Sequence, residues 1–240
     1  SYIEKGNFAG SLALQRQLLL DYEEDVRKYA EGLDQAKILS VYRHVPTQLA
    51  KENKKFIYGL VREGGRAKEF ETAIMWLCDC GLVHKVSRIT TPNLPLKAYE
   101  DLKAFKIYHL EIGLLRVLCG IEPQIILDSE AVFKEFMGSL TEQYVLQELQ
   151  SAEITSNIYY WSEGGTSEVD FIFSYKNRIV PVEAKAGLVV HAQSLRVFCE
   201  KYEPNVAIRT SLKGFRRDGR LLNLPLYLLW KINRILDGVE

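Results

Sequence analysis

Residues 167–185 read SEVDFIFSYKNRIVPVEAK, two runs of apolar, aromatic and β-branched residues separated by a short polar segment. This pattern predicts a β-hairpin with strands Glu168–Ser174 and Arg178–Lys185. The polar pair Lys176-Asn177 is typical of the tight turn that joins such strands. We therefore expect this hairpin to organise the second half of the chain.

The register of the two strands determines which charged side chains meet. Side chains alternate between the two faces of a strand. The first strand is expected to carry two faces, with Val169, Phe171 and Phe173 on one and Glu168, Asp170 and Ile172 on the other. If Tyr175 pairs with Arg178 across the turn, Asp170 lies opposite Glu183. A slip of one residue would separate these two carboxylates.

Opposed carboxylates at Asp170 and Glu183 repel each other unless a positive group lies between them. Side chains directly opposite each other in a hairpin lie roughly 4.5–5.5 Å apart at Cβ. A divalent cation such as Mg²⁺, which binds carboxylates and waters, fits such a pair. Lys185, on the same face, could then hold a water or a phosphate oxygen. The alternative is a solvated polar face on which Lys185 offsets one of the acids.

The composition is that of an ordinary globular protein with one large or two small domains. The 240 residues are 47% hydrophobic and 26% charged. Lys and Arg together number 31, as do Asp and Glu, so no overall charge attracts nucleic acid or a membrane. Any site for a polyanion must therefore be local.

The sequence is typical of a cytoplasmic protein, because no signal peptide is evident and no apolar run approaches the roughly 18 residues of a membrane span. The four cysteines are expected to be reduced, and Cys78-x-Cys80 lacks the partner pair of a zinc site. Because the chain begins at Ser1 rather than at Met, we expect it to be part of a longer protein.

Residues 1–122 are expected to form a helical and winged-helix domain. Apolar residues at helical spacing predict helices at Leu12–Tyr29, Asp34–Arg43 and Ala67–Cys80. Short runs rich in apolar residues predict strands at Lys55–Val61, Leu82–Ile89 and Phe105–Leu110. A helix followed by a glycine turn and a two-stranded ribbon suggests a winged helix. The helix at 67–80 carries three acidic residues, which favours packing or assembly over DNA binding.

Residues 123–240 are expected to form a second, α/β domain with a mixed sheet. Its predicted helices are Asp128–Gln150, Ala192–Tyr202 and Trp230–Leu236, and its strands beside the hairpin are Asn157–Trp161 and Val206–Thr210. The helix and strand after the hairpin are those of a parallel crossover. Gly214–Arg220 is interpreted as a loop.

Glu142 lies on one helical stripe with three apolar residues, Val145, Leu146 and Leu149. Because that stripe must face a core, a carboxylate at its edge points toward the sheet that carries the hairpin. The alternative is structural: Ser139-x-x-Glu142 has the spacing of a capping box, so that Glu142 would restart an interrupted helix.

The order of these elements resembles the PD-(D/E)XK restriction-endonuclease-like superfamily, with Glu142 on a helix, Asp170 on one strand and Glu183-Ala184-Lys185 on the next. Val169-Asp170 stands in place of the usual Pro-Asp. The resemblance implies hydrolysis of DNA or RNA with Mg²⁺ or Mn²⁺. It implies that Asp170 and Glu183 hold the metal, that Glu142 binds a metal-coordinated water, and that Lys185 positions the attacking water or stabilises charge. An accessory polar role is implied for Gln193.

Several segments also resemble the C-terminal region of a prokaryotic AAA-type ATPase family, in which a nucleotide-binding domain precedes a winged helix and a nuclease-like domain. They are QLAKENKKF (48–56), GLVH (81–84), LPLKAYE (94–100) and LTEQYVLQEL (140–149). The chain contains no G-x-x-x-x-G-K-[ST] loop. ATP binding is therefore implied only for an N-terminal ATPase domain outside this chain, which would be its partner.

Four cations around the segment Gly214–Arg220 are the best candidates for contacts with nucleic acid: Lys213, Arg216, Arg217 and Arg220. The alternative for this segment is a solvated surface loop.

Two functions remain open on the sequence alone. The acidic face and the Glu-x-Lys motif favour a metal-dependent nuclease module. The neutral net charge favours an inactive nuclease-like fold that serves as a regulatory or protein-interaction module. Assembly into a homo-oligomer through Leu222–Leu236 is a third interpretation.

Overall fold

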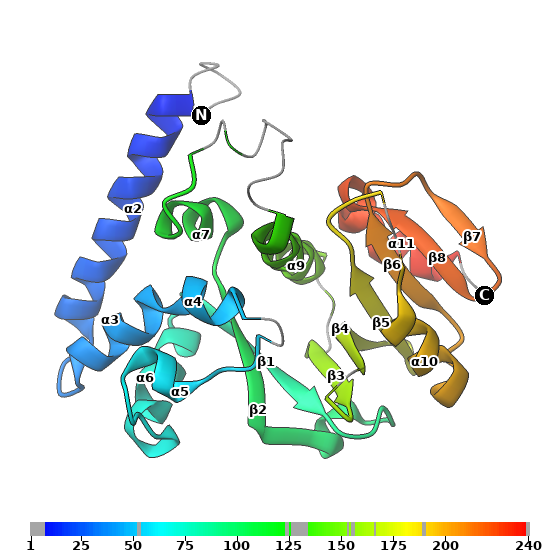
Figure 1. The fold of residues 1–240 in the computed structure, drawn as a ribbon, viewed down its shortest axis with the longest axis horizontal. Coiled ribbons are helices and arrows are strands. Elements are labelled where there is room, and N and C mark those ends of the chain that lie inside the picture. The colour runs from blue at the N-terminus through cyan, green and yellow to red at the C-terminus, as the bar shows by residue number, and fades with distance from the viewer. Residues whose placement is uncertain are drawn as a thin grey trace. The chain divides into compact units, whose positions relative to one another are not determined.

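The computed structural model describes residues 8–51, 54–122, 125, 134–152, 154, 157–165, 167–188 and 191–238 (Figure 1). The chain divides into two compact units. The first comprises Ser1–Lys85 with Lys106–Lys134, and the second comprises Val86–Phe105 with Glu135–Glu240. A helical first part followed by an eight-stranded mixed sheet confirms the expected α/β fold class.

The first unit is built mainly from helices. They are α2 (Phe8–Tyr29), α3 (Gln35–Arg43), α4 (Val45–Leu49), α5 (Tyr58–Val61), α6 (Ala67–Asp79) and α7 (Ile112–Leu118). The side chain of Asp34 caps α3 by accepting a hydrogen bond from the Lys37 N–H at 3.1 Å. Helices α3 and α6 pack on each other, and each carries fully buried side chains, such as Val41 and Leu77.

The strand expected at Lys55–Val61 is wrong, because its second half forms the helical turn α5. The buried side chain of Gln48 bonds both main-chain groups of Ile57. Its Nε2 donates to the Ile57 carbonyl at 3.0 Å, and its Oε1 accepts from the Ile57 N–H at 2.8 Å. Because these are the groups that a strand would use in a ladder, the segment needs no neighbouring strand.

The predicted order of a helix, a glycine turn and two strands is present in α6, Gly81, β1 (Val83–Ile89) and β2 (Glu100–His109). Gly81 has a φ of +71°, which is the left-handed conformation common just after a helix. In addition, β1 pairs in parallel with β3 through Ser87–Ile89 and so joins the large sheet. The winged-helix interpretation stays a prediction.

The eight-stranded sheet has the order β2-β1-β3-β4-β5-β6-β8-β7. Its remaining strands are β3 (Tyr159–Glu163), β4 (Ser167–Tyr175), β5 (Arg178–Ala184), β6 (Ala207–Ser211), β7 (Arg216–Asp218) and β8 (Leu221–Pro225). Strands β3, β4 and β5 are antiparallel, whereas β5, β6 and β8 run parallel. The parallel pair β5 and β6 confirms the predicted crossover.

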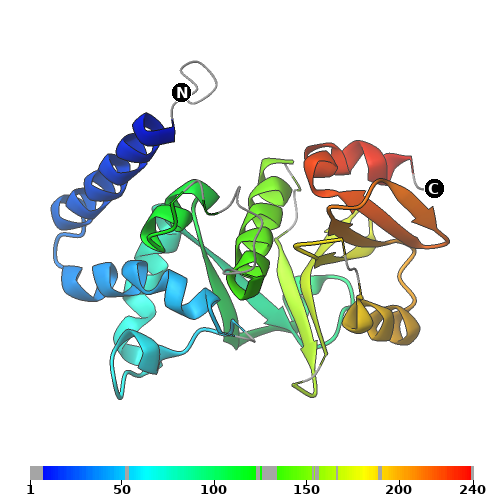
Figure 2. The same cartoon turned by 45° about the horizontal axis from the view of Figure 1, so that its top comes forward.

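Helices cover the sheet of the second unit. They are α9 (Lys134–Ser151), α10 (Gln193–Tyr202) and α11 (Ile232–Asp237), with the 3₁₀ helices Leu96–Tyr99 (η1) and Leu226–Lys231 (η2). Figure 1 and Figure 2 both show α9 and α10 on opposite sides of β4 and β5. The start expected for α9, at Asp128, lies outside the described residues. No helix in the described part of the chain has the length and apolar character needed to cross a membrane.

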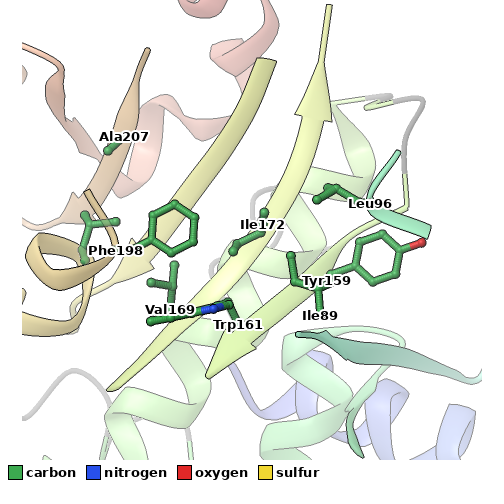
Figure 3. Close-up of a cluster of buried hydrophobic side chains, with 9 residues drawn as sticks. Ile89, Leu96, Tyr159, Trp161, Val169, Ile172, Phe198 and Ala207 are labelled. Carbon is green, nitrogen blue, oxygen red and sulfur yellow. The ribbon is translucent and has the colours of Figure 1, made fainter. Parts of the chain in front are cut away.

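The core beneath α10 reveals a correction to the expected faces of β4. Trp161, Val169, Ile172 and Phe198 lie in one buried cluster (Figure 3). Val169 and Ile172 therefore share a face, although strict alternation separates them. The cause is a bulge, because Tyr159 pairs with Ile172 while Trp161 pairs with Val169, which leaves one extra residue on β4.

The hairpin itself has the predicted register. Tyr175 pairs with Arg178, and the ladder continues to Phe171 opposite Val182. Lys176 and Asn177 have φ values of 45° and 60°, as required by the two central residues of a type I′ turn. Asn tolerates this left-handed conformation better than most residues do, which explains how this sequence closes a two-residue turn.

Replacement of Asn177 by Ala is expected to lower the free energy of unfolding by about 1 kcal/mol, because Ala lacks the side chain that eases a positive φ. Replacement by Gly, which adopts this conformation without strain, is the matched control and is expected to be neutral or slightly stabilising. Urea unfolding followed by circular dichroism measures both. Equal destabilisation by Ala and Gly would contradict the turn assignment.

The C-terminal strands differ from the sequence interpretation in one respect. The segment Gly214–Arg220 contains a short edge strand, β7, whose three residues are exposed and pair antiparallel with β8. A run of four charged residues in the five positions 216–220 gave no alternating pattern by which to recognise it. An edge strand needs no apolar face, and charged residues are common there.

Candidate functional site

Asp170 and Glu183 lie on adjacent strands at the point where the β4–β5 ladder ends. They are the next residues after the Phe171–Val182 pair. Both are buried, with 8% and 5% of their surface exposed. The Ala184 N–H donates to Oδ2 of Asp170 at 2.8 Å, so that a carboxylate replaces the next main-chain partner in the ladder. This bond ties the two strands together at the site.

Glu183 forms an ion pair with Lys185, which is two residues further along the chain. The distance from Lys185 Nζ to Glu183 Oε1 is 2.6 Å, and the side chains are 29% and 7% exposed. The second oxygen, Oε2, is buried and has no hydrogen-bond partner in the described part of the structure. Since a buried carboxylate oxygen normally has a partner, this atom marks a place where a further positive group fits.

The charges of the site act on one another. Burial raises the pKa of Glu183 above its ordinary 4.5; the adjacent Lys185 opposes this rise, and the carboxylates of Glu142 and Glu168 add to it. Burial by itself lowers the pKa of Lys185, but Glu183, Asp170 and Glu142 outweigh it, so that the pKa is raised. The lysine is therefore a cation at neutral pH, surrounded by acids.

Glu142 comes to the site from α9. It is 6% exposed, while Val145, Leu146 and Leu149 on the same stripe are fully buried. The helix runs without a break from Lys134 to Ser151, so the alternative of a helix restart at Ser139 is wrong. The Glu142 carboxylate raises the pKa of both Glu183 and Lys185, so it lies within electrostatic range of these two groups.

The donor set suits a magnesium-like cation bound in part through water. No group of three or more His, Cys, Asp or Glu side chains that could hold a metal exists among the described residues. Mg²⁺, however, keeps several waters and commonly uses one or two carboxylates. Asp170 and Glu183 provide these, and the unpaired Oε2 of Glu183 fits the role of a ligand. Glu142 would then contact a metal-bound water rather than the metal.

The remaining sequence-predicted residues lie elsewhere. Lys213 and Arg216 line a pocket beside β8, while Arg217 is exposed and donates from Nε to the Gly219 carbonyl at 3.3 Å. Arg220 is exposed at the turn into β8. Gln193 is exposed at the first position of α10, and its accessory role stays a prediction.

Arg209 and Asn223 were missed by the sequence interpretation. Arg209 is paired with Glu183 across β5 and β6, and with Asn223 across β6 and β8. The signal that could have found Arg209 is the register of the predicted parallel crossover, since Arg209 interrupts an apolar run in that strand.

The fold and the site define a mixed α/β protein that gathers carboxylates and a lysine around a hairpin. Residues 1–125 match the family model described as a domain of unknown function, DUF8612. Because this match covers more than half of the 240 residues, the chain belongs to that family. Residues 137–229 match a second domain of unknown function, DUF4143. Comparisons with curated proteins and with solved structures gave no match.

Proposed function

We propose that the second unit is a divalent-cation-dependent nuclease-like domain that hydrolyses phosphodiester bonds in nucleic acid. The observation that carries this proposal is the buried Glu183 carboxylate, which has one oxygen on Lys185 and the other without a partner among the residues that the structure describes. A protein core does not retain such a group for stability, because burial of a charge without full pairing is unfavourable. Groups of this kind cluster at functional sites.

Asp170 and Glu183 would hold the cation, which when bound lowers the pKa of a water and shields the phosphate charge. The Ala184 N–H fixes the orientation of Asp170 through its bond to Oδ2. Glu142, on helix α9, would accept a hydrogen bond from a water molecule and so orient it. Each of these residues is held by a strand or a long helix, which favours a defined geometry.

Lys185 acts as a cation rather than as a general base in this proposal. Its raised pKa keeps the ammonium group protonated at neutral pH. A protonated lysine can donate to a phosphate oxygen and stabilise the negative charge that develops as the bond to the leaving oxygen breaks. Glu183 Oε1 holds the ammonium group in place at 2.6 Å.

The resemblance of several segments to an AAA-type ATPase family, together with the DUF4143 match, supports the proposal that this chain is the C-terminal part of such an ATPase. ATP would bind only in the domain outside this chain. The second candidate function is an inactive nuclease-like module that regulates or binds a protein partner. It is favoured by the absence of a three-ligand metal group among the described residues and by the balanced net charge.

Cleavage assays separate the two functions. Labelled single-stranded and duplex DNA and RNA are incubated with the protein in Mg²⁺ or Mn²⁺, and again in EDTA. The proposal expects cation-dependent cleavage that Asp170→Asn removes, since Asn keeps the hydrogen bond to Ala184 but not the charge. Absence of cleavage under all conditions, or cleavage that Asp170→Asn leaves intact, favours the inactive module.

A further inference from the structure

A second polar site lies on the sheet next to the candidate hydrolytic site. A surface pocket of about 170 Å³ is lined by three cations, Arg209, Lys213 and Arg216. Asp218 is the acidic side chain in its lining, and Asn223 forms part of it. A chain with no net charge therefore concentrates positive charge at one place, which is the local site that a polyanion requires.

The pocket is built by Asn223, a 4% exposed residue on β8. Its Oδ1 accepts from Arg209 Nε and from Ser211 Oγ, both at 3.2 Å. Its Nδ2 donates to the Gly214 carbonyl at 2.8 Å and to the Lys213 carbonyl at 3.4 Å. One buried amide thus fixes both the guanidinium group and the loop between β6 and β7. The Arg209 guanidinium group and the main chain that carries Lys213 are therefore held in position.

The register of the sheet connects this pocket with the carboxylates. Glu183, Arg209, Asn223 and Arg216 are successive partners across β5, β6, β8 and β7. Residues paired directly across strands lie in one row on one face of the sheet. Neighbouring strands are about 4.8 Å apart, so Glu183 and Asn223 are separated by roughly 10 Å. A single polymer chain can therefore contact both sites.

An exposed aromatic residue lies next to two of these cations in the sequence. Phe215, between Gly214 and Arg216, is 54% exposed. Single-stranded nucleic acid is commonly bound by a basic groove that follows the phosphates and by aromatic rings on which unpaired bases stack. The faces of paired bases inside a duplex are not available for such stacking. The combination of an exposed Phe215 with a pocket lined by three cations fits a single strand better than a duplex.

We propose that residues 209–223 bind single-stranded nucleic acid, with a backbone phosphate in the pocket of Arg209, Lys213 and Arg216 and a base stacked on Phe215. The interpretation of these residues as a substrate site rests on the proposed function. Binding of the strand by itself requires neither the divalent cation nor cleavage. Asp218 opposes the phosphate, so Asp218→Asn tightens binding.

Fluorescence anisotropy tests the inference with a labelled DNA strand of about 12 nucleotides, a length within the usual range of such sites, and with its duplex, both in EDTA. Phe215→Leu keeps an apolar side chain but loses the ring, and is expected to weaken single-strand binding roughly 5- to 150-fold. Phe215→Trp is expected to retain binding. Tyr227→Leu, at another exposed aromatic residue, is the matched control and leaves binding unchanged.

The cations are tested by salt dependence. Lys213→Gln and Arg216→Gln each are expected to weaken binding and to reduce the slope of log affinity against log salt by about 1. Arg234→Gln, at an exposed cation on α11, is the control. Because binding is measured in EDTA, where cation-dependent cleavage cannot occur, its outcome is separate from that of the cleavage proposal. Equal affinity for duplex and single strand, or equal binding by Phe215→Leu, would overturn the inference.

Discussion

Lys185→Met is expected to reduce phosphodiester cleavage roughly 100- to 1000-fold, the effect of removing one donor that stabilises charge in a transition state. Met has a similar length and apolar stem but no positive charge. The effect should appear in kcat, because the ammonium group acts on charge that develops during the reaction. The raised pKa of Lys185 means that the lost group is a cation and not a base.

Lys201→Met is the matched control for this variant. Lys201 is also paired with a glutamate, Glu163, but it lies exposed on α10. Cleavage by the control should equal that of the wild type. If Lys185→Met cleaves at the wild-type rate while both variants are folded, Lys185 has no part in the chemistry.

Glu183→Gln is expected to abolish the rise in thermal stability that Mg²⁺ or Mn²⁺ gives to the wild type. A ligand at 100 times its Kd stabilises the folded state by about 2.7 kcal/mol. Gln keeps the shape of the side chain and an oxygen that can accept from Lys185, but it removes the charge that a cation needs. Thermal unfolding with and without cation measures the difference, and Glu163→Gln, at an exposed carboxylate, is the control.

The wild type is expected to show a pH dependence of stability that the Glu183→Gln variant lacks. Because the pKa of Glu183 is raised above 4.5 in the folded state, the folded protein binds this proton more tightly than the unfolded chain does. The stability of the cation-free wild type therefore gains from this group at low pH, and loses that gain as the pH rises from 4.5 through the folded pKa. Stabilisation by the cation should grow over the same window, since the cation competes with the proton. Both trends should be absent in Glu183→Gln.

The local pattern of residues 167–185 is enough to predict the hairpin and its register. A polar two-residue turn sets which residues pair, and alternating apolar residues on both strands admit few other registers. Glu142 could be assigned to the same site because a carboxylate on an apolar helical stripe must face the core that the stripe covers. Both features depend on residues that are close together in the sequence, so the local pattern is enough to predict them.

Other features depend on partners that are distant in sequence. The bulge in β4 arises from its pairing with β3 and moves Val169 to the face of Ile172. The helical turn at Tyr58–Val61 depends on Gln48, which supplies the main-chain bonds that a strand would otherwise seek. Arg209 reaches the row of Glu183 only through the register of a parallel pair. No periodicity in the local sequence carries this information.

Titration with Mn²⁺, followed by the electron paramagnetic resonance signal of the free ion, tests the central claim most directly. The account predicts that the wild type binds one Mn²⁺ ion and that added Mg²⁺ displaces it. The double variant Asp170→Asn with Glu183→Gln, shown to be folded by circular dichroism, is predicted to bind no Mn²⁺ at this site. Equal Mn²⁺ binding by the wild type and the double variant would contradict the account, as would a folded wild type that binds no ion.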